Sequence, residues 1–107
     1  MDLRQARTFV TVAELGTISR AAQHLRIAQP ALSRQIQNLE QELGLKLFDR
    51  VGGRLLLTGQ GELLLGDCRD LLAHASAVRE RAQSLRHEDS GVLKVAAAPG
   101  NIESVFA

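Results

Sequence analysis

Apolar residues near the start of the chain recur every three or four positions, which is the spacing of one helix face. Residues 2–15 follow this repeat and predict a first helix. Gly16 would end it, because glycine readily adopts the left-handed conformation that follows many helices. Thr17 can cap a second helix, which we expect to end at Leu25. Two helices are therefore predicted in close succession.

A third, longer helix is predicted from Pro30 to Leu43, after a short turn. Proline suits a first helical turn, where its missing N–H costs nothing, and Gly44 follows the last apolar residue. One side carries an aliphatic stripe formed by Leu32, Ile36, Leu39 and Leu43. The other side carries Ser33, Arg34, Gln37 and Gln41. This polar face suits the DNA major groove, where base edges offer donors and acceptors.

Two short apolar stretches between Leu45 and Thr58 flank a Gly-Gly pair, which is a hairpin signal. We predict a two-stranded wing with Arg50 and Arg54 at or near its tip. In isolation such a hairpin would be a plain surface turn. Directly after a groove-binding helix, a phosphate or minor-groove contact is the better interpretation.

A long helix is predicted from about residue 60 to His87, because apolar residues there alternate spacings of four and three. The stripe consists of Leu64, Cys68, Leu71, Ala75, Val78, Ala82 and Leu85. Leu63, Leu65 and Leu72 widen it near the start, where we expect it also to pack on the preceding helices. A narrow stripe needs a partner helix, and the predicted partner is the same helix of a second copy.

The end of the chain changes character. Residues 87–91 are predicted to be a polar linker, and residues 92–98 resemble a short buried strand. Too few residues follow to bury that strand, so the chain is expected to stop just inside a further domain. We therefore predict a mainly α protein with a winged helix-turn-helix head (1–59), a dimerisation helix (60–88) and a truncated domain (89–107).

Charge is divided unevenly along the chain. Residues 1–61 hold eight Lys/Arg and five Asp/Glu, a net charge of +3, whereas residues 62–90 hold four and six, a net charge of −2. A basic head fits a polyanionic partner, although charge alone leaves ordinary surface scatter open. With three Phe and neither Trp nor Tyr, the core must be aliphatic, and stacking of single-stranded bases on aromatic side chains is disfavoured.

Catalysis, metal binding and membrane insertion are not expected. His24, His74, His87 and Cys68 form no ligand-spaced cluster, and no phosphate loop or nucleophile motif occurs. The single cysteine excludes an internal disulfide and suits a small buried hydrophobe. No apolar run reaches the roughly 20 residues that span a bilayer, and no signal segment is visible at the N-terminus. We therefore predict no enzyme activity and no cofactor.

A set of motifs closely resembles the N-terminal part of bacterial LysR-type transcriptional regulators, over residues 1 to about 90. The matching residues are Phe9, Val12 to Gly16, Ala21-Ala22, Leu25, Gln29 to Ser33, Ile36, Leu39-Glu40, Leu43-Gly44, Leu47 to Arg50, Leu57-Thr58 and Gly61. The resemblance implies a winged helix-turn-helix head and a linker helix that pairs two subunits antiparallel. It also implies a C-terminal effector-binding domain that resembles periplasmic binding proteins, of which only the opening would be present.

The same resemblance implies which residues contact DNA. They are Gln29, Pro30, Ser33, Arg34 and Arg50, to which we add Gln37, Asn38 and Arg54 as further candidate contacts. Arg34 is the best candidate for a base contact, since arginine can donate two hydrogen bonds to guanine. Gln29 could contact a base edge and Ser33 a base or a phosphate, while Gln37 and Asn38 are weaker candidates.

One position departs from the family pattern. The family usually carries an arginine three residues after the position of Arg50, and it reaches the minor groove; here that residue is Gly53 and the arginine is Arg54. A shift of one residue in a strand reverses the direction of the side chain. Either the flexible Gly52-Gly53 pair lets Arg54 take the role, which is our working expectation, or the wing contact is weaker.

The expected function is a sequence-specific regulator that binds double-stranded DNA as a homodimer on a pseudo-palindromic operator. Higher oligomers and a small-molecule effector would belong to the full-length protein, and the expected location is the bacterial cytoplasm at the nucleoid. The alternative is a non-specific, architectural DNA-binding protein, which a head charge of only +3 disfavours.

Overall fold

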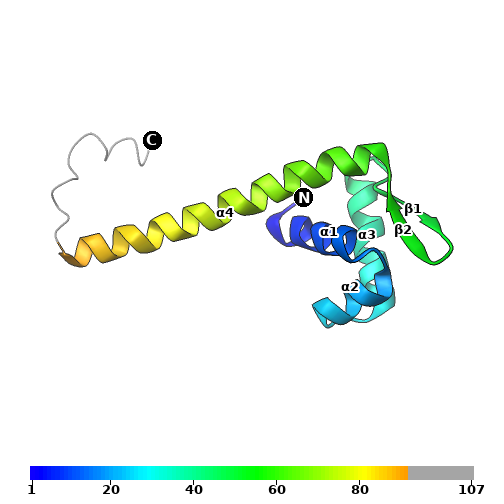
Figure 1. Cartoon of the computed structure of the whole chain (residues 1–107), viewed down its shortest axis with the longest axis horizontal. Coiled ribbons are helices and arrows are strands. Elements are labelled where there is room, and N and C mark those ends of the chain that lie inside the picture. Colours follow the sequence, from blue (N-terminus) through cyan, green and yellow to red (C-terminus); the bar gives the residue numbers. More distant parts are fainter. Residues whose placement is uncertain (92–107) are drawn as a thin grey trace. The chain divides into compact units, whose positions relative to one another are not determined.

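The computed structural model describes the backbone of residues 1–91. The first part contains three helices and a hairpin, gathered beside one another in Figure 1: α1 (Leu3–Leu15), α2 (Ile18–Leu25), α3 (Gln29–Leu43), β1 (Phe48–Val51) and β2 (Arg54–Leu57). A long helix, α4 (Gly59–Gly91), follows. The mainly α architecture with a two-stranded wing is therefore confirmed. The strand expected at residues 92–98 lies outside the described residues.

Local signals explain where α1 and α2 begin and end. Asp2 caps α1 by accepting the N–H of Gln5, whose side chain accepts the Asp2 N–H in return. Gly16 ends the helix at φ 81°, as predicted. Thr17 caps α2 through the N–H of Arg20 at 3.1 Å. These short-range contacts determine where α1 ends and where α2 begins.

The turn between α2 and α3 contains a strained residue. Arg26 ends α2 in the left-handed conformation, at φ 60°, which is uncommon for residues other than glycine and asparagine. The N–H of Ile27 donates to the Ala22 carbonyl at 3.0 Å and closes the turn. Pro30 lies in the first turn of α3, and Gly44 ends that helix at φ 71°. The predicted helix-turn-helix unit is confirmed.

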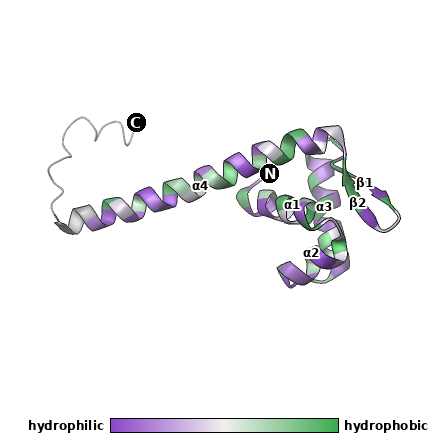
Figure 2. Ribbon diagram, viewed as in Figure 1, coloured by the Kyte–Doolittle hydropathy of each residue, from purple (hydrophilic) through white to green (hydrophobic). Residues whose placement is uncertain are grey.

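The core of the head, by which we mean α1 to α3 and the hairpin, is mostly aliphatic. It includes Ala6, Phe9, Val12, Ala21, Ala22, Leu32, Ile36, Leu39, Leu47, Phe48 and Leu55. Figure 2 shows hydrophobic and hydrophilic residues alternating around the helices that enclose it. Phe9 and Phe48 meet edge to face, with ring centroids 5.5 Å apart. Because Ala21 and Ala22 are small and fully covered, the neighbouring helices can approach α2 closely.

The wing is the β1–β2 hairpin. Its strands pair antiparallel, with Arg50 opposite Leu55 and Val51 opposite Arg54. Gly52 and Gly53 both have positive φ, as a two-residue hairpin turn requires. Glu40 of α3 anchors the start of the wing, since its carboxylate accepts the N–H groups of Leu47 at 2.8 Å and Phe48 at 3.2 Å. The wing is thereby fixed to α3.

The start of α4 packs against the head. Thr58 caps the helix, accepting the N–H of Gly61 at 2.9 Å and donating its hydroxyl hydrogen to the Lys46 carbonyl at 2.7 Å. Leu65 and Cys68 are buried, and Leu72 packs against the same core. Leu63, which we expected to help cover the head, is instead 75% exposed. It lies on the outer side of the helix, away from the buried residues.

The described chain divides into two units, Met1–Ala73 and a second that begins at His74, and α4 contributes to both. The prediction that this helix ends near residue 87 and gives way to a linker was wrong, because α4 continues to Gly91. Polar residues do not by themselves end a helix, because a helix can continue where no apolar face has to be buried. The proposed domain boundaries remain predictions.

Candidate nucleic-acid interface

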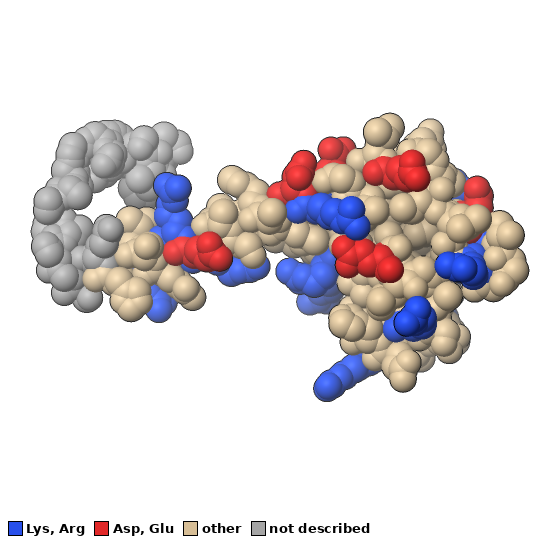
Figure 3. All heavy atoms as spheres, viewed as in Figure 1, with Lys and Arg blue, Asp and Glu red and all other residues tan. Residues whose placement is uncertain are grey.

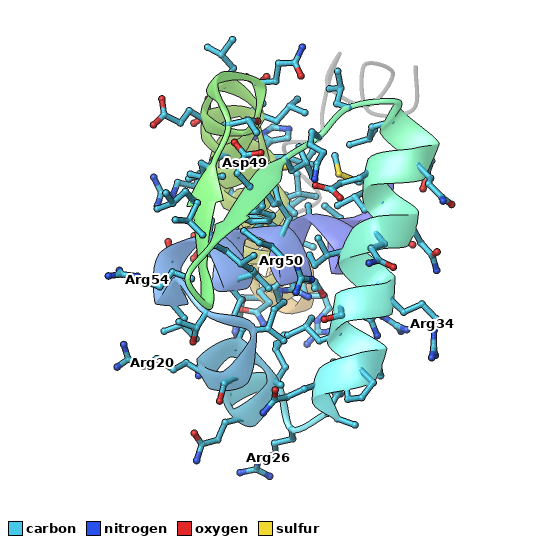
Figure 4. The ribbon with its side chains drawn as sticks, turned by 90° about the vertical axis from the view of Figure 1, so that its right-hand side faces the viewer. Arg20, Arg26, Arg34, Asp49, Arg50 and Arg54 are labelled. Carbon is cyan, nitrogen blue, oxygen red and sulfur yellow. The ribbon has the colours of Figure 1, made fainter. Side chains whose placement is uncertain are left out.

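Helix α3 presents two sharply different faces. Leu32, Ile36 and Leu39 are buried in the core, as the sequence predicts. The predicted contact residues lie on the accessible side: Gln29, Pro30, Arg34, Gln37 and Asn38 are exposed and Ser33 is half-buried. Arg34 points away from the head in Figure 4. A rigid helix therefore carries an accessible row of hydrogen-bonding side chains, which is the geometry that groove recognition requires.

A hollow of about 600 Å³ lies beside the N-terminal end of α3. We call it the basic hollow; it is lined by Thr17, Ile18, Ser19, Gln29, Pro30, Ser33, Arg50, Gly53, Arg54 and Leu55. It brings together the first turn of α2, the first turn of α3 and the tip of the wing. Because the first N–H groups of a helix are unsatisfied within the helix, two helix N-termini here favour an anion.

Arg50 and Ser33 connect the wing to α3 across this hollow. The Arg50 guanidinium donates to the Ser33 hydroxyl at 3.5 Å, a long hydrogen bond between exposed groups. Figure 4 places Arg50 between the wing and α3. A long bond of this kind is weak, so the guanidinium can turn to a stronger acceptor such as a phosphate oxygen.

The acids of the head are mostly engaged within the structure itself. Glu40 accepts N–H groups of the wing, Glu42 pairs with the Met1 ammonium group, and Glu14 pairs with Arg69 of α4 at 3.2 Å. Asp2 caps α1. Of the five acids in the head, Asp49 is left at the surface without such a contact among the described residues.

The arginines of the helix-turn-helix and the wing, in contrast, form no ion pair within the described residues. They are Arg20, Arg26, Arg34, Arg50 and Arg54, and all five are exposed. Figure 4 shows them distributed around one end of the head, and on the face drawn in Figure 3 the part over α2 carries basic side chains without acidic ones. This surface keeps a positive charge that its own acids do not neutralise.

Two of these arginines escaped the sequence prediction. Arg20 lies in the first turn of α2 and Arg26 at its left-handed end, and neither belongs to the polar face of α3 on which the prediction relied. A signal was present, since Arg20 follows the predicted cap Thr17 by three residues. The prediction stopped at the recognition helix because helix packing, and not sequence, brings the start of α2 to the same hollow.

The register of the wing decides the direction of its two arginines. Arg50 lies opposite Leu55, which is buried, while Arg54 lies opposite Val51, which is exposed. Side chains alternate between the faces of a strand, so Arg50 and Arg54 leave opposite faces of the hairpin. Gly53, the position of the family arginine, lies in the turn between the strands, so Arg54 is the first residue of β2. Whether Arg54 takes the role of that arginine stays a prediction.

The stripe predicted for dimerisation is already partly covered by its own chain. Cys68 is only 2% exposed and Leu64 packs against the core of the head. Burial raises the pKa of the Cys68 thiol, and the nearby Asp67 carboxylate adds to this. Further along, Ala75 is half-buried, and the exposed members are Leu71, Val78, Ala82 and Leu85. A second copy could therefore pack on the stripe from Leu71 onward.

Two negative findings concern the described part of the chain. Its His, Cys, Asp and Glu side chains do not gather into a group of three or more that could hold a metal ion. None of its helices combines the length and apolarity needed to cross a bilayer.

Comparison with known proteins gives a family match over the head. Residues 3–62 match the family described as "Bacterial regulatory helix-turn-helix protein, lysR family". The chain is 44% identical over 95 residues to the HTH-type transcriptional regulator TfdT of Cupriavidus pinatubonensis, a match that covers 89% of this chain and 42% of TfdT. The chain thus spans less than half the length of that relative.

Solved structures give the same result for the fold. The DNA-binding domain of CbnR in complex with DNA has a TM-score of 0.74 and 37% identity, covering 78% of this chain and 97% of that one. The BenM DNA-binding domain in complex with benA site 1 DNA has a TM-score of 0.76 and 39% identity, covering 79% of this chain and 99% of that one.

Proposed function

The chain belongs to the lysR family of bacterial regulatory helix-turn-helix proteins, and from this premise we propose that it binds double-stranded DNA sequence-specifically as a homodimer. One observation carries the proposal: the accessible polar face of α3 lies beside the basic hollow, whose arginines have no acidic partner among the described residues. The structures of CbnR and BenM domains with DNA support the choice of partner.

Base recognition is assigned to α3. Arg34 extends from the accessible face and can donate two hydrogen bonds to a guanine. Gln29, in the first turn, can donate to and accept from a base edge. Gln37 and Asn38 lie about one turn beyond Arg34 and would contact bases only if α3 enters the groove deeply. Specificity therefore rests mainly on the N-terminal half of the helix.

Positioning on the backbone is assigned to the basic hollow. A phosphate there would meet the unsatisfied N–H groups at the start of α2, the Ser33 hydroxyl and the Arg50 guanidinium. Contacts of this kind fix the register of the protein on the duplex without carrying sequence information. They also make binding weaken with salt.

Dimer formation is assigned to α4. Leu71, Val78 and Leu85 are 42%, 55% and 57% exposed in the single chain, and they recur at the spacing of a helical seam. Pairing two such helices would cover them and set the distance between the two heads. A regulator of this type would act at DNA in the bacterial cytoplasm, without catalysis.

A competition experiment distinguishes sequence-specific from non-specific DNA binding. A labelled duplex enriched from a random library is bound by the protein, and unlabelled duplexes of the same or of unrelated sequence are added. We expect the unrelated duplex to compete about 10³-fold or more less effectively, as for specific regulators. Equal competition by both duplexes would support the architectural alternative instead.

A further inference from the structure

Arg54, the displaced wing arginine, is connected through the backbone to the turn that precedes α2, the helix of Arg20. The N–H of Leu55, directly after Arg54, donates to the carbonyl of Gly16 at 3.0 Å, which ties β2 to the turn before α2. Arg20 follows that turn closely, and its own N–H is bound by the cap Thr17 at 3.1 Å. A backbone hydrogen bond therefore joins the strand of Arg54 to Gly16, and Arg20 lies about one helical turn after Gly16.

Both guanidinium groups extend toward the same side. Figure 4 shows Arg20 and Arg54 at one edge of the head, whereas Arg34 extends from the opposite edge. Both are exposed, and neither is part of an ion pair within the described residues. Two cationic groups on one edge favour an anion there. The start of α2 adds the positive end of its helix dipole.

We propose that Arg20 and Arg54 together bind phosphate groups of the DNA strand that borders the groove occupied by α3. Arg54 thus acts on the DNA backbone rather than on the floor of the minor groove, because the register of the hairpin turns it away from the face of Arg50. The partner is a phosphate strand, since a flexible pair of cations from two elements suits a row of anions and carries no base pattern. This inference rests on the proposed function.

The proposal predicts how the salt dependence of DNA binding changes when either arginine is removed. Each arginine that neutralises a phosphate makes the slope of log K against log salt more negative by about 0.9. Removing one should therefore flatten the slope by about one unit and weaken binding about three- to tenfold at moderate salt. Base preferences should not change, because neither residue touches a base.

The test compares Arg20→Ala, Arg54→Ala and the double variant with the parent chain, on a duplex enriched by that parent. Arg7→Ala is the matched control, because Arg7 is an exposed arginine of α1 that does not line the basic hollow. Dissociation constants are measured by fluorescence anisotropy between 50 and 300 mM salt, at about 25 °C. Circular dichroism checks that each variant is folded, which we expect since both side chains are exposed.

The outcomes are distinct. We expect both single variants to flatten the slope more than Arg7→Ala does, with the double variant losing about two units, and the binding motif to stay the same. Singles that bind like Arg7→Ala would overturn the proposal. So would an Arg54→Ala variant that loses a preference for A·T pairs in the flank at unchanged slope, since that is minor-groove recognition. Failure of the proposed function shows itself separately, as a parent chain that does not prefer its enriched duplex.

Discussion

At the scale of single residues, the acids and arginines of the head have separate tasks. Glu40 accepts two backbone N–H groups of the wing, and Glu42 and Glu14 tie together segments distant in sequence. The arginines remain available to a ligand. A net head charge of only +3 therefore understates the positive field at the hollow, because the acids that balance it in the count lie elsewhere.

Arg34 carries the sharpest prediction at this scale. Arg34→Ala should cost about 1–3 kcal/mol of binding free energy on the preferred duplex and relax base preference at one position of each half-site. The reason is the loss of a bidentate contact to a guanine edge. Binding to a panel of single-base variants of the duplex measures both effects. A variant that keeps the affinity and the motif of the parent would remove α3 from the role of recognition helix.

The terminal ion pair predicts a pH dependence of stability. The hydrogen bond from the Met1 ammonium lowers the pKa of the Glu42 carboxyl, and the same bond raises the pKa of the ammonium. The contribution of Glu42 is thus present above its ordinary pKa of about 4.3 and is lost as pH falls through the lowered value. The contribution of Met1 is present below about 8 and is lost as pH rises through the raised value.

Glu42→Gln should therefore lower the melting temperature most between about pH 5 and 8, and the difference from the parent should shrink on both sides of this window. The effect is small, since both groups are exposed and such pairs contribute little. Thermal unfolding followed by circular dichroism across pH measures it. A difference that stays constant from pH 3 to pH 10 would show that the charges do not cause it.

At the scale of elements, the junction between the wing and α4 depends on a glycine. A Cβ added at Gly61 would lie 2.3 Å from the Leu47 carbonyl oxygen, whereas one added at Gly66 would meet nothing within 4 Å. Both glycines lie in the same helix. The first is required by a close approach of two backbones, and the second only weakens the helix.

The two alanine substitutions should therefore have opposite signs. Gly61→Ala should destabilise the fold by about 1–3 kcal/mol, because α4 must move away from the wing. Gly66→Ala should stabilise it by about 0.5–1 kcal/mol through helix propensity. Urea unfolding of the two variants beside the parent measures both changes. Two shifts of the same sign would contradict the packing described for this junction.

Local signals allowed much of the fold to be predicted. Caps, glycines and apolar spacing located α1, α2 and α3 because these depend on residues a few positions apart. The stripe of α4 was harder, since periodicity cannot tell whether Cys68 is covered by its own head or by a second copy. The end of α4 was misjudged because polar residues suit an exposed helix and a linker equally well. Arg20 was missed because tertiary packing, and not local sequence, brings the start of its helix to the hollow that the wing also lines.

At the scale of the whole molecule, the proposed dimer rests on the exposed apolar side chains of α4. Leu71→Asp should weaken self-association at least about tenfold, because a carboxylate buried between two helices would lack a partner. Leu63→Asp is the matched control, since Leu63 is exposed but lies outside the stripe. Sedimentation velocity over a range of concentrations compares the two. A dimer that survives Leu71→Asp must use another surface.

Selection from a random duplex library at moderate salt, followed by sequencing of the bound DNA, tests the central claim most directly. We expect a two-fold-symmetric motif with a G·C pair in each half-site that depends on Arg34, and a half-site spacing that reports the separation of the two heads. Binding without any enriched motif would contradict sequence-specific recognition by a dimer and would leave phosphate contacts as the whole of the interaction.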